Sequence, residues 1–207
     1  GGPYGTTCAR VGCMPSKLLI AAAESVHQIE KAPGFGIYPQ GETIINGADV
    51  MARVKSERDR FVGFVVEGVD EIPAQDKVSG YARFLNNNTL LVDDHTQISA
   101  KRIVIATGSR PAYPAIWNEL GERLIINDDV FDWDDLPKSI AVFGPGVIDL
   151  KLGQSLKRLG VDVLMFGLDG QVGPLTDPAV IAYANKSSNE EFSLMLMLML
   201  MLMLKLK

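Results

Sequence analysis

Apolar positions recur at helical spacing in two long segments of the first third of the chain. In Lys17–Lys31 they are Leu18, Leu19, Ala22, Ala23, Val26 and Ile29, and Pro33-Gly34 marks the end of the segment. Between Ala48 and about Val69 they are Val50, Val54, Phe61, Val62, Val65 and Val66. Both patterns predict amphipathic helices.

The pattern becomes strand-like after Lys77. Turn compositions at Asn86-Asn87-Asn88 and Asp93-Asp94 divide three short segments, which are Val78–Leu85, Thr89–Val92 and Ile98–Ser99. The apolar run in Lys101–Gly108 then predicts a buried strand that ends in a glycine turn.

A strand–turn–helix–strand unit follows in the last third of the chain. Ser139–Phe143 predicts the first strand, a helix continues to Leu159, and Val161–Phe166 predicts the second strand. The turn between strand and helix consists of Gly144, Pro145, Gly146, Val147 and Ile148. In this context Gly144 suits a tight turn, and Gly146 lets the backbone approach a dinucleotide pyrophosphate at the helix N-terminus. An ordinary α/β unit with a glycine turn is the alternative.

Two positions depart from the usual dinucleotide fingerprint. Asp149 stands where the third glycine is expected, so its carboxylate would lie near a bound pyrophosphate. Repulsion at close range costs on the order of 1–4 kcal/mol, which corresponds to roughly one to three decades in affinity. The second strand ends at Gly167, where NAD-binding proteins usually carry an acidic residue, and Asp169 is near enough to substitute. The choice between NAD and NADP therefore stays open.

Composition places the chain among ordinary globular proteins. Of its 207 residues, 47% are hydrophobic and 22% are charged, with a net charge of −5. This length is enough for one large or two small domains. No basic stripe is visible, which argues against binding to nucleic acid. The absence of a visible signal sequence and the presence of only two cysteines predict a reducing, cytoplasmic location.

Two charged runs and a repetitive terminus are interpreted as solvated or nonfunctional. The mixed run Lys55–Arg60 predicts a solvated helix face. Pro111–Pro137 is interpreted as a solvated linker, packed against the domains by Trp117 and Trp133, and its acidic spacing does not fit an EF-hand. Residues 193–207 form a low-complexity tail of alternating Leu and Met, too short for a membrane span. We predict no metal site and no membrane association.

Both cysteines lie ahead of the first predicted helix, separated by four residues. Pro15 suits the first helical position, which places Cys13 just outside the helix N-terminus, where the macrodipole favours an anion. A thiol there ionises more readily, and the thiolate is its reactive form. Lys17 adds a nearby positive charge. From the residues alone, the Cys8–Cys13 pair is a structural disulfide, half of a zinc site or a redox-active dithiol.

Residues 1–17 resemble the active-site motif of the class I pyridine nucleotide–disulfide oxidoreductases, which are flavin-dependent enzymes. The resemblance rests on the glycine-rich lead-in, the Cys-x4-Cys spacing, Val11-Gly12 and Pro15-Ser16-Lys17. The Pro-Ser-Lys ending is more similar to dihydrolipoamide dehydrogenases and mercuric reductases than to glutathione reductases. In family terms, Cys8 is the interchange thiol that attacks a disulfide such as lipoamide, and Cys13 is the thiolate beside the flavin.

The resemblance also implies an architecture. It predicts an α/β fold in which residues 1–112 form an incomplete FAD-binding domain and residues 113–192 a partial Rossmann-type NAD(P)-binding domain. The FAD-site residues that it implies are Thr7, Lys17, Gly80, Ala82, Thr107 and Gly108. The residues that it implies for NAD, with NADP not excluded, are Gly144, Gly146, Val147 and Ile148.

Two parts of the family pattern have no counterpart in this sequence: an opening strand with a Gly-x-Gly-x-x-Gly turn, and a C-terminal dimerisation domain with a His-Glu acid/base pair. We therefore expect an internal piece of a homodimeric enzyme that passes electrons between NAD(P)H and a disulfide through FAD. The parent is expected to resemble dihydrolipoamide dehydrogenase, with mercuric or glutathione reductases as alternatives. A truncated, inactive module without flavin and a flavin-free thiol–disulfide exchanger also stay open.

Overall fold

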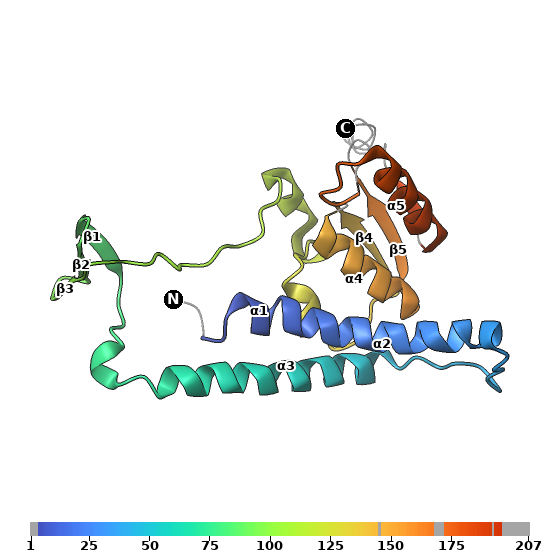
Figure 1. Ribbon diagram of the computed structural model, residues 1–207, viewed down its shortest axis with the longest axis horizontal. Coiled ribbons are helices and arrows are strands. Elements are labelled where there is room, and N and C mark those ends of the chain that lie inside the picture. Colours follow the sequence, from blue (N-terminus) through green and yellow to red (C-terminus); the bar gives the residue numbers. More distant parts are fainter. Residues whose placement is uncertain (1–3, 145, 168–171, 192, 196–207) are drawn as a thin grey trace.

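The computed structural model describes residues 4–144, 146–167 and 172–191, and the backbone of residues 193–195. Two long helices, α2 (Cys13–Lys31) and α3 (Gly47–Asp70), run antiparallel to each other (Figure 1). The single-turn helix α1 (Thr7–Arg10) precedes α2 and contacts both. On the other side of α2 lies a parallel sheet with helices α4 (Val147–Arg158) and α5 (Pro178–Glu191).

The periodicity predicted both long helices to within a few residues. α3 begins where the Asn46 side chain accepts a hydrogen bond from the Asp49 N–H group at 3.3 Å, an N-cap. α2 begins earlier than expected: Cys13 is its first residue and Pro15 its third. Pro15 is tolerated there because the N–H groups of the first turn have no partner within the helix. The placement of Cys13 outside the helix was wrong, although Cys13 remains at its N-terminal end.

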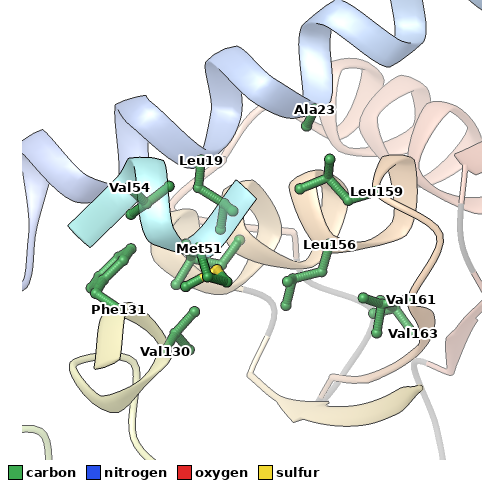
Figure 2. Close-up of a cluster of buried hydrophobic side chains, with 11 residues drawn as sticks. Leu19, Ala23, Met51, Val54, Val130, Phe131, Leu156, Leu159, Val161 and Val163 are labelled. Atoms are coloured by element: carbon green, nitrogen blue, oxygen red, sulfur yellow. The ribbon is translucent and has the colours of Figure 1, made fainter. Parts of the chain in front are cut away.

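The buried core lies where α2 meets α3 and α4. Leu19 of α2 and Met51 of α3 are each 0% exposed, and Leu156 of α4 is 1% exposed. Figure 2 shows these side chains converging from the three helices, with Val130 and Phe131 of the 3₁₀ helix η4 (Asp129–Asp132) beneath them. The remaining buried members of this cluster are Ala23, Val54, Leu152, Leu159, Val161 and Val163. The helix pair and the parallel sheet therefore share one core.

The parallel sheet contains β4 (Ser139–Phe143), β5 (Asp162–Phe166) and β6 (Ser193–Met195), in that order. α4 connects β4 to β5, so the predicted strand–turn–helix–strand unit is present. A Cβ atom at Gly153 of α4 would lie 2.6 Å from Met165 Cε, so glycine allows the helix to pack closely on the sheet. β6 comes from the start of the Leu/Met tail, whose residues 196–207 lie outside the described part of the chain.

A separate antiparallel meander consists of β1 (Ala82–Asn86), β2 (Thr89–Val92) and β3 (Thr96–Ser99), reached through the 3₁₀ helix η2 (Ala74–Asp76). In Figure 1 it lies at the far end of the molecule from the parallel sheet. All five residues of β1 are exposed.

The predicted buried strand at Lys101–Gly108 is not formed. The segment is extended but carries no strand, and Val104 and Ile105 are 85% and 71% exposed. A buried strand needs a neighbour for its N–H and C=O groups, and no strand of the described residues lies alongside. The apolar run alone was not sufficient to predict a buried strand.

The two charged runs bind each other. Lys55 Nζ of α3 lies 2.5 Å from Asp134 Oδ1, and Arg58 Nη1 lies 2.6 Å from Asp132 Oδ1. Arg58 also donates to the Phe131 carbonyl oxygen at 2.9 Å. The interpretation of both runs as purely solvated was therefore incomplete, because opposite charges fix the linker to α3.

Both tryptophans of the linker pack as expected. The Trp117 ring, in the 3₁₀ helix η3 (Ala115–Arg123), lies 5.1 Å from that of Phe143 in β4. Trp133 packs against the core cluster. A further 3₁₀ helix, η1 (Ala32–Phe35), follows α2.

A cavity at the shared core should destabilise the whole chain. We expect Leu19→Ala to lower the free energy of unfolding by about 2–5 kcal/mol, the usual cost of this truncation in a packed core. Chemical denaturation followed by circular dichroism measures the difference. Ile44→Ala is the matched control, because Ile44 is 86% exposed and should change stability by less than about 0.5 kcal/mol. Equal effects of the two substitutions would contradict the shared core.

Candidate active site

The turn between α1 and α2 brings the two cysteines together. Cys8 lies in α1 and Cys13 begins α2, and both are exposed free thiols. The Val11 N–H group donates to the Thr7 carbonyl oxygen at 3.0 Å. A Cβ atom at Gly12 would lie 2.9 Å from the same oxygen. Any larger residue at position 12 would therefore push α1 away from α2 and separate the thiols.

The residues ahead of Cys8 hold α1 in place. Thr6 has a φ of 51°, which is uncommon for a β-branched residue, and its Oγ1 accepts a hydrogen bond from the Ala9 N–H group at 3.1 Å. Gly5 has a φ of 123°, and a Cβ atom there would lie 2.9 Å from Val62 Cγ1 of α3. The glycine of the motif thus permits both the backbone turn and close contact with α3.

The two thiols differ in acidity. The hydrogen bond from the Cys8 thiol to Cys13 lowers the pKa of Cys13 and raises the pKa of Cys8. The positive charges of Lys151 and Lys17 lower the pKa of Cys13 further, while partial desolvation opposes them. Cys13 is therefore the preferred thiolate and Cys8 the preferred thiol.

Lys151 is a site residue that the sequence reasoning missed. Its Nζ, on α4, donates to Ser16 Oγ of α2 at 3.1 Å. The two residues are 135 positions apart, so no local pattern could reveal the contact. The only sequence signal for this contact is that Ser16 belongs to the Pro15-Ser16-Lys17 motif.

The residues predicted for FAD are not gathered in one place. Thr7 and Lys17 lie beside the cysteines on α1 and α2. Gly80 and Ala82 lie at the start of the distant meander, and Thr107 and Gly108 follow in the exposed extended segment. In this arrangement they do not form a single flavin-binding surface.

The residues predicted for NAD are together at the turn between β4 and α4. Gly144 has a φ of 122° and donates its N–H to the Phe166 carbonyl oxygen at 2.9 Å. Gly146 is the N-cap of α4, and Val147 and Ile148, the first two helical residues, are largely exposed.

The Asp149 carboxylate lies over this glycine turn. A Cβ atom at Gly146 would be 2.8 Å from Asp149 Oδ2, and one at Gly144 would be 3.2 Å away. Burial raises the pKa of Asp149, although hydrogen bonds from its own N–H group and that of Gly146 act in the opposite direction. The carboxylate thus takes the position and the backbone donors that an anion at a helix N-terminus would use.

A pocket of about 370 Å³ lies beside α4 and shares Val147 and Lys151 with the arrangements described above. It is lined by Val147, Leu150, Lys151, Gln154, residues 172–175, Ser187 and Ser188. Neither cysteine lines it. Within the described part of the chain, no cluster of three or more His, Cys, Asp or Glu side chains is placed to hold a metal ion. No helix among those residues has the length and apolar character needed to cross a membrane.

Comparison with known proteins decides the family. Residues 3–198 match the family described as pyridine nucleotide-disulphide oxidoreductase. The chain belongs to this family. The interpretation of residues 1–17 as its active-site motif thus led to the correct family, and the α/β fold with elements of FAD- and NAD-binding domains is that of the family.

Several curated relatives cover most of this chain. A dihydrolipoyl dehydrogenase from Chlamydia muridarum is 30% identical over 85% of the chain and 38% of its own length. One from Thermus scotoductus is 32% identical over 90% of the chain and 40% of its own length. A mercuric reductase from Lysinibacillus sphaericus is 28% identical over 92% of the chain and 34% of its own length. The chain therefore spans about two fifths or less of these relatives.

A solved structure has the same fold. The Cu(II) complex of an HOCl-induced flavoprotein disulfide reductase from Escherichia coli superposes with a TM-score of 0.68 and 20% identity. It covers 93% of this chain, and the chain covers 40% of it.

The family uses FAD and NAD(P), and the structure allows a test of how this chain fits the two groups. The dispersed FAD residues do not cradle a flavin in this arrangement. The glycine turn does not fit a pyrophosphate while the Asp149 carboxylate lies against Gly144 and Gly146. Asp169, the other residue considered for NAD, lies outside the described residues.

Removal of the Asp149 carboxylate should open the glycine turn. We expect Asp149→Gly to bind NADH at least roughly tenfold more tightly than the wild-type chain, since charge repulsion of this kind costs on the order of 1–4 kcal/mol. Isothermal titration calorimetry measures both affinities. Wild-type affinity should also rise as the pH falls through the raised pKa of Asp149, because protonation removes the charge, and the variant should lack this change.

Asp162→Asn is the control for this experiment. Asp162 begins β5, at the opposite end of the strand from the glycine turn. The control should bind NADH as the wild type does. Equal affinities of Asp149→Gly and the wild type would show that the carboxylate does not block the turn.

Proposed function

We propose that Cys8 and Cys13 form the redox-active dithiol of an FAD-dependent enzyme that transfers electrons between NAD(P)H and a disulfide substrate, with lipoamide as the first choice. The observation that supports this most directly is the pairing of two exposed thiols with opposite pKa shifts at the start of α2. Similarity to dihydrolipoyl dehydrogenases and mercuric reductases supports the same reaction class. A mercuric-reductase-like parent remains the second choice.

The proposed exchange begins at Cys8. The Cys8 proton moves along its hydrogen bond to Cys13, the Cys8 thiolate attacks one sulfur of the substrate disulfide, the substrate S–S bond breaks, and the proton passes on to the departing sulfur. Cys13, again a thiolate, then attacks the Cys8 sulfur of the mixed disulfide. The Cys8–Cys13 disulfide forms and the second substrate sulfur leaves as a thiolate. Two electrons pass from the dithiol to the substrate, and the reverse sequence oxidises a substrate dithiol.

The lowered pKa of Cys13 suits the resolving step. A thiolate is the nucleophile in disulfide exchange. Cys13 is ready for the resolving step because the Cys8 hydrogen bond lowers its pKa. Cys8 gives up its proton to Cys13 before it attacks, and that proton is then available to the first leaving sulfur. In the whole enzyme we propose that FAD and NAD(P)H carry electrons to and from the pair, in a cytoplasmic homodimer.

A flavin-free thiol–disulfide exchanger is the alternative function. The dispersal of Gly80, Ala82, Thr107 and Gly108 away from the cysteines favours it for the chain taken alone. The visible absorption spectrum of the purified chain separates the two functions. A flavin band that persists through gel filtration would exclude the alternative. A colourless chain that still exchanges disulfides would support the alternative for this chain.

Replacing either cysteine with serine should change how much mixed disulfide accumulates, and the two replacements should differ. Reduced Cys13→Ser, given oxidised lipoamide, should accumulate a mixed disulfide at Cys8, because the resolving thiolate is gone. Cys8→Ser is the matched control and should accumulate much less adduct, since the attacking thiol is missing. Mass spectrometry of the intact chains measures both adducts. Equal trapping by the two variants, or none by either, would contradict the assigned roles.

A further inference from the structure

A hydrogen-bonded chain links α4 to the turn that carries Cys13. Lys151 Nζ donates to Ser16 Oγ at 3.1 Å, and Ser16 Oγ in turn donates to the Gly12 carbonyl oxygen at 2.6 Å. The Cys13 carbonyl oxygen is also 3.2 Å from Ser16 Oγ. Ser16 is only 1% exposed, so its hydroxyl depends on partners within the protein. This series of hydrogen bonds ends at Gly12, the residue that immediately precedes Cys13.

Packing of α4 on α2 does not require this lysine. Leu19 and Ala23 of α2 meet Leu156 of α4 in the apolar contact between the helices (Figure 2), and Leu152 belongs to the same buried cluster. Ser16 already has an acceptor in the Gly12 carbonyl oxygen. Lys151 places a positive charge at the end of the α2–α4 interface that carries Cys13.

The charged and titratable groups around Cys13 come from three elements. Cys8 of α1 donates a hydrogen bond to it, and Lys17 of α2 and Lys151 of α4 both stabilise its anion, so all three lower the pKa of Cys13. Only Lys151 comes from outside the motif of residues 1–17. Its contribution exists only when α4 is docked on α2.

We propose that Lys151 is a positioning residue of the redox dithiol: through Ser16 it holds the first turn of α2, and its ammonium group stabilises the Cys13 thiolate from across the helix interface. This inference rests on the proposed function of the Cys8–Cys13 pair. It makes the reactivity of the dithiol depend on the docking of the dinucleotide-type unit that contains α4.

The test compares the alkylation of Cys13 by iodoacetamide in wild type and Lys151→Met over a range of pH. Peptide mass spectrometry follows Cys13 separately from Cys8. We expect the midpoint of the pH profile to rise and the rate at neutral pH to fall about two- to fivefold, as suits the loss of one partly solvated charge. Lys151→Arg should restore most of the rate. The difference should shrink at high salt, because salt screens the charge.

Lys157→Met is the matched control on the same helix. Lys157 Nζ lies 3.9 Å from Asp162 Oδ1, at the end of α4 remote from the cysteines, so this variant should react as the wild type does. Ser16→Ala provides a second variant that removes the hydrogen-bonded chain but keeps the lysine, and it should raise the midpoint by less than Lys151→Met does. Circular dichroism establishes that each variant is folded.

An alkylation profile of folded Lys151→Met that superposes on the wild-type profile would overturn the inference. If Lys151→Met does not fold, the inference is overturned when both Ser16→Ala and Lys151→Gln show the wild-type alkylation profile. Alkylation needs no disulfide substrate, so its outcome is independent of the trapping experiment. If no mixed disulfide is trapped but the alkylation profile of Lys151→Met is shifted, only the proposed function is contradicted. If the mixed disulfide is trapped but the alkylation profile is not shifted, only the role of Lys151 is contradicted.

Discussion

Helix α2 is buried between α3 and α4, and this packing joins the helix pair to the parallel sheet. Leu19, Met51 and Leu156 meet there, almost without exposure to solvent. Because α4 belongs to the strand–turn–helix–strand unit, this contact fixes that unit against the helix that carries Cys13. The charge pairs of Lys55 and Arg58 hold the intervening linker to the same body.

Two charged residues near the start of α4 face different partners. Asp149 turns toward the glycine turn, where its carboxylate uses the backbone donors that a phosphate would use. Lys151 reaches instead to Ser16 in the first turn of α2. One helix therefore carries an internal anion at its own N-terminus and a cation that we propose supports the Cys8–Cys13 pair. Both effects are electrostatic, but only that of Lys151 depends on the docking of α4 on α2.

The chemistry of the thiol pair follows from short-range geometry. The closeness of Gly12 to the Thr7 carbonyl oxygen sets α1 against α2, and the Cys8 hydrogen bond then makes the two thiols unequal. Sequential attack and resolution is the use that we propose for this unequal pair. The meander and the extended segment that follows it lie apart from this site, so the residues expected at the flavin are not assembled by these contacts.

Features that depend on neighbours along the chain could be predicted from the residues alone. These are the two long helices, the unit from β4 to β5, the cysteine motif and, through it, the family, since helical spacing, capping and glycine turns are local. The exposure of Lys101–Gly108 could be seen only in the folded structure. The tertiary structure alone placed Lys151 beside Ser16. A strand needs an adjacent strand for its backbone hydrogen bonds, and the effect of a charge depends on the groups around it. Both come from distant parts of the sequence, so the local pattern of residues cannot predict them.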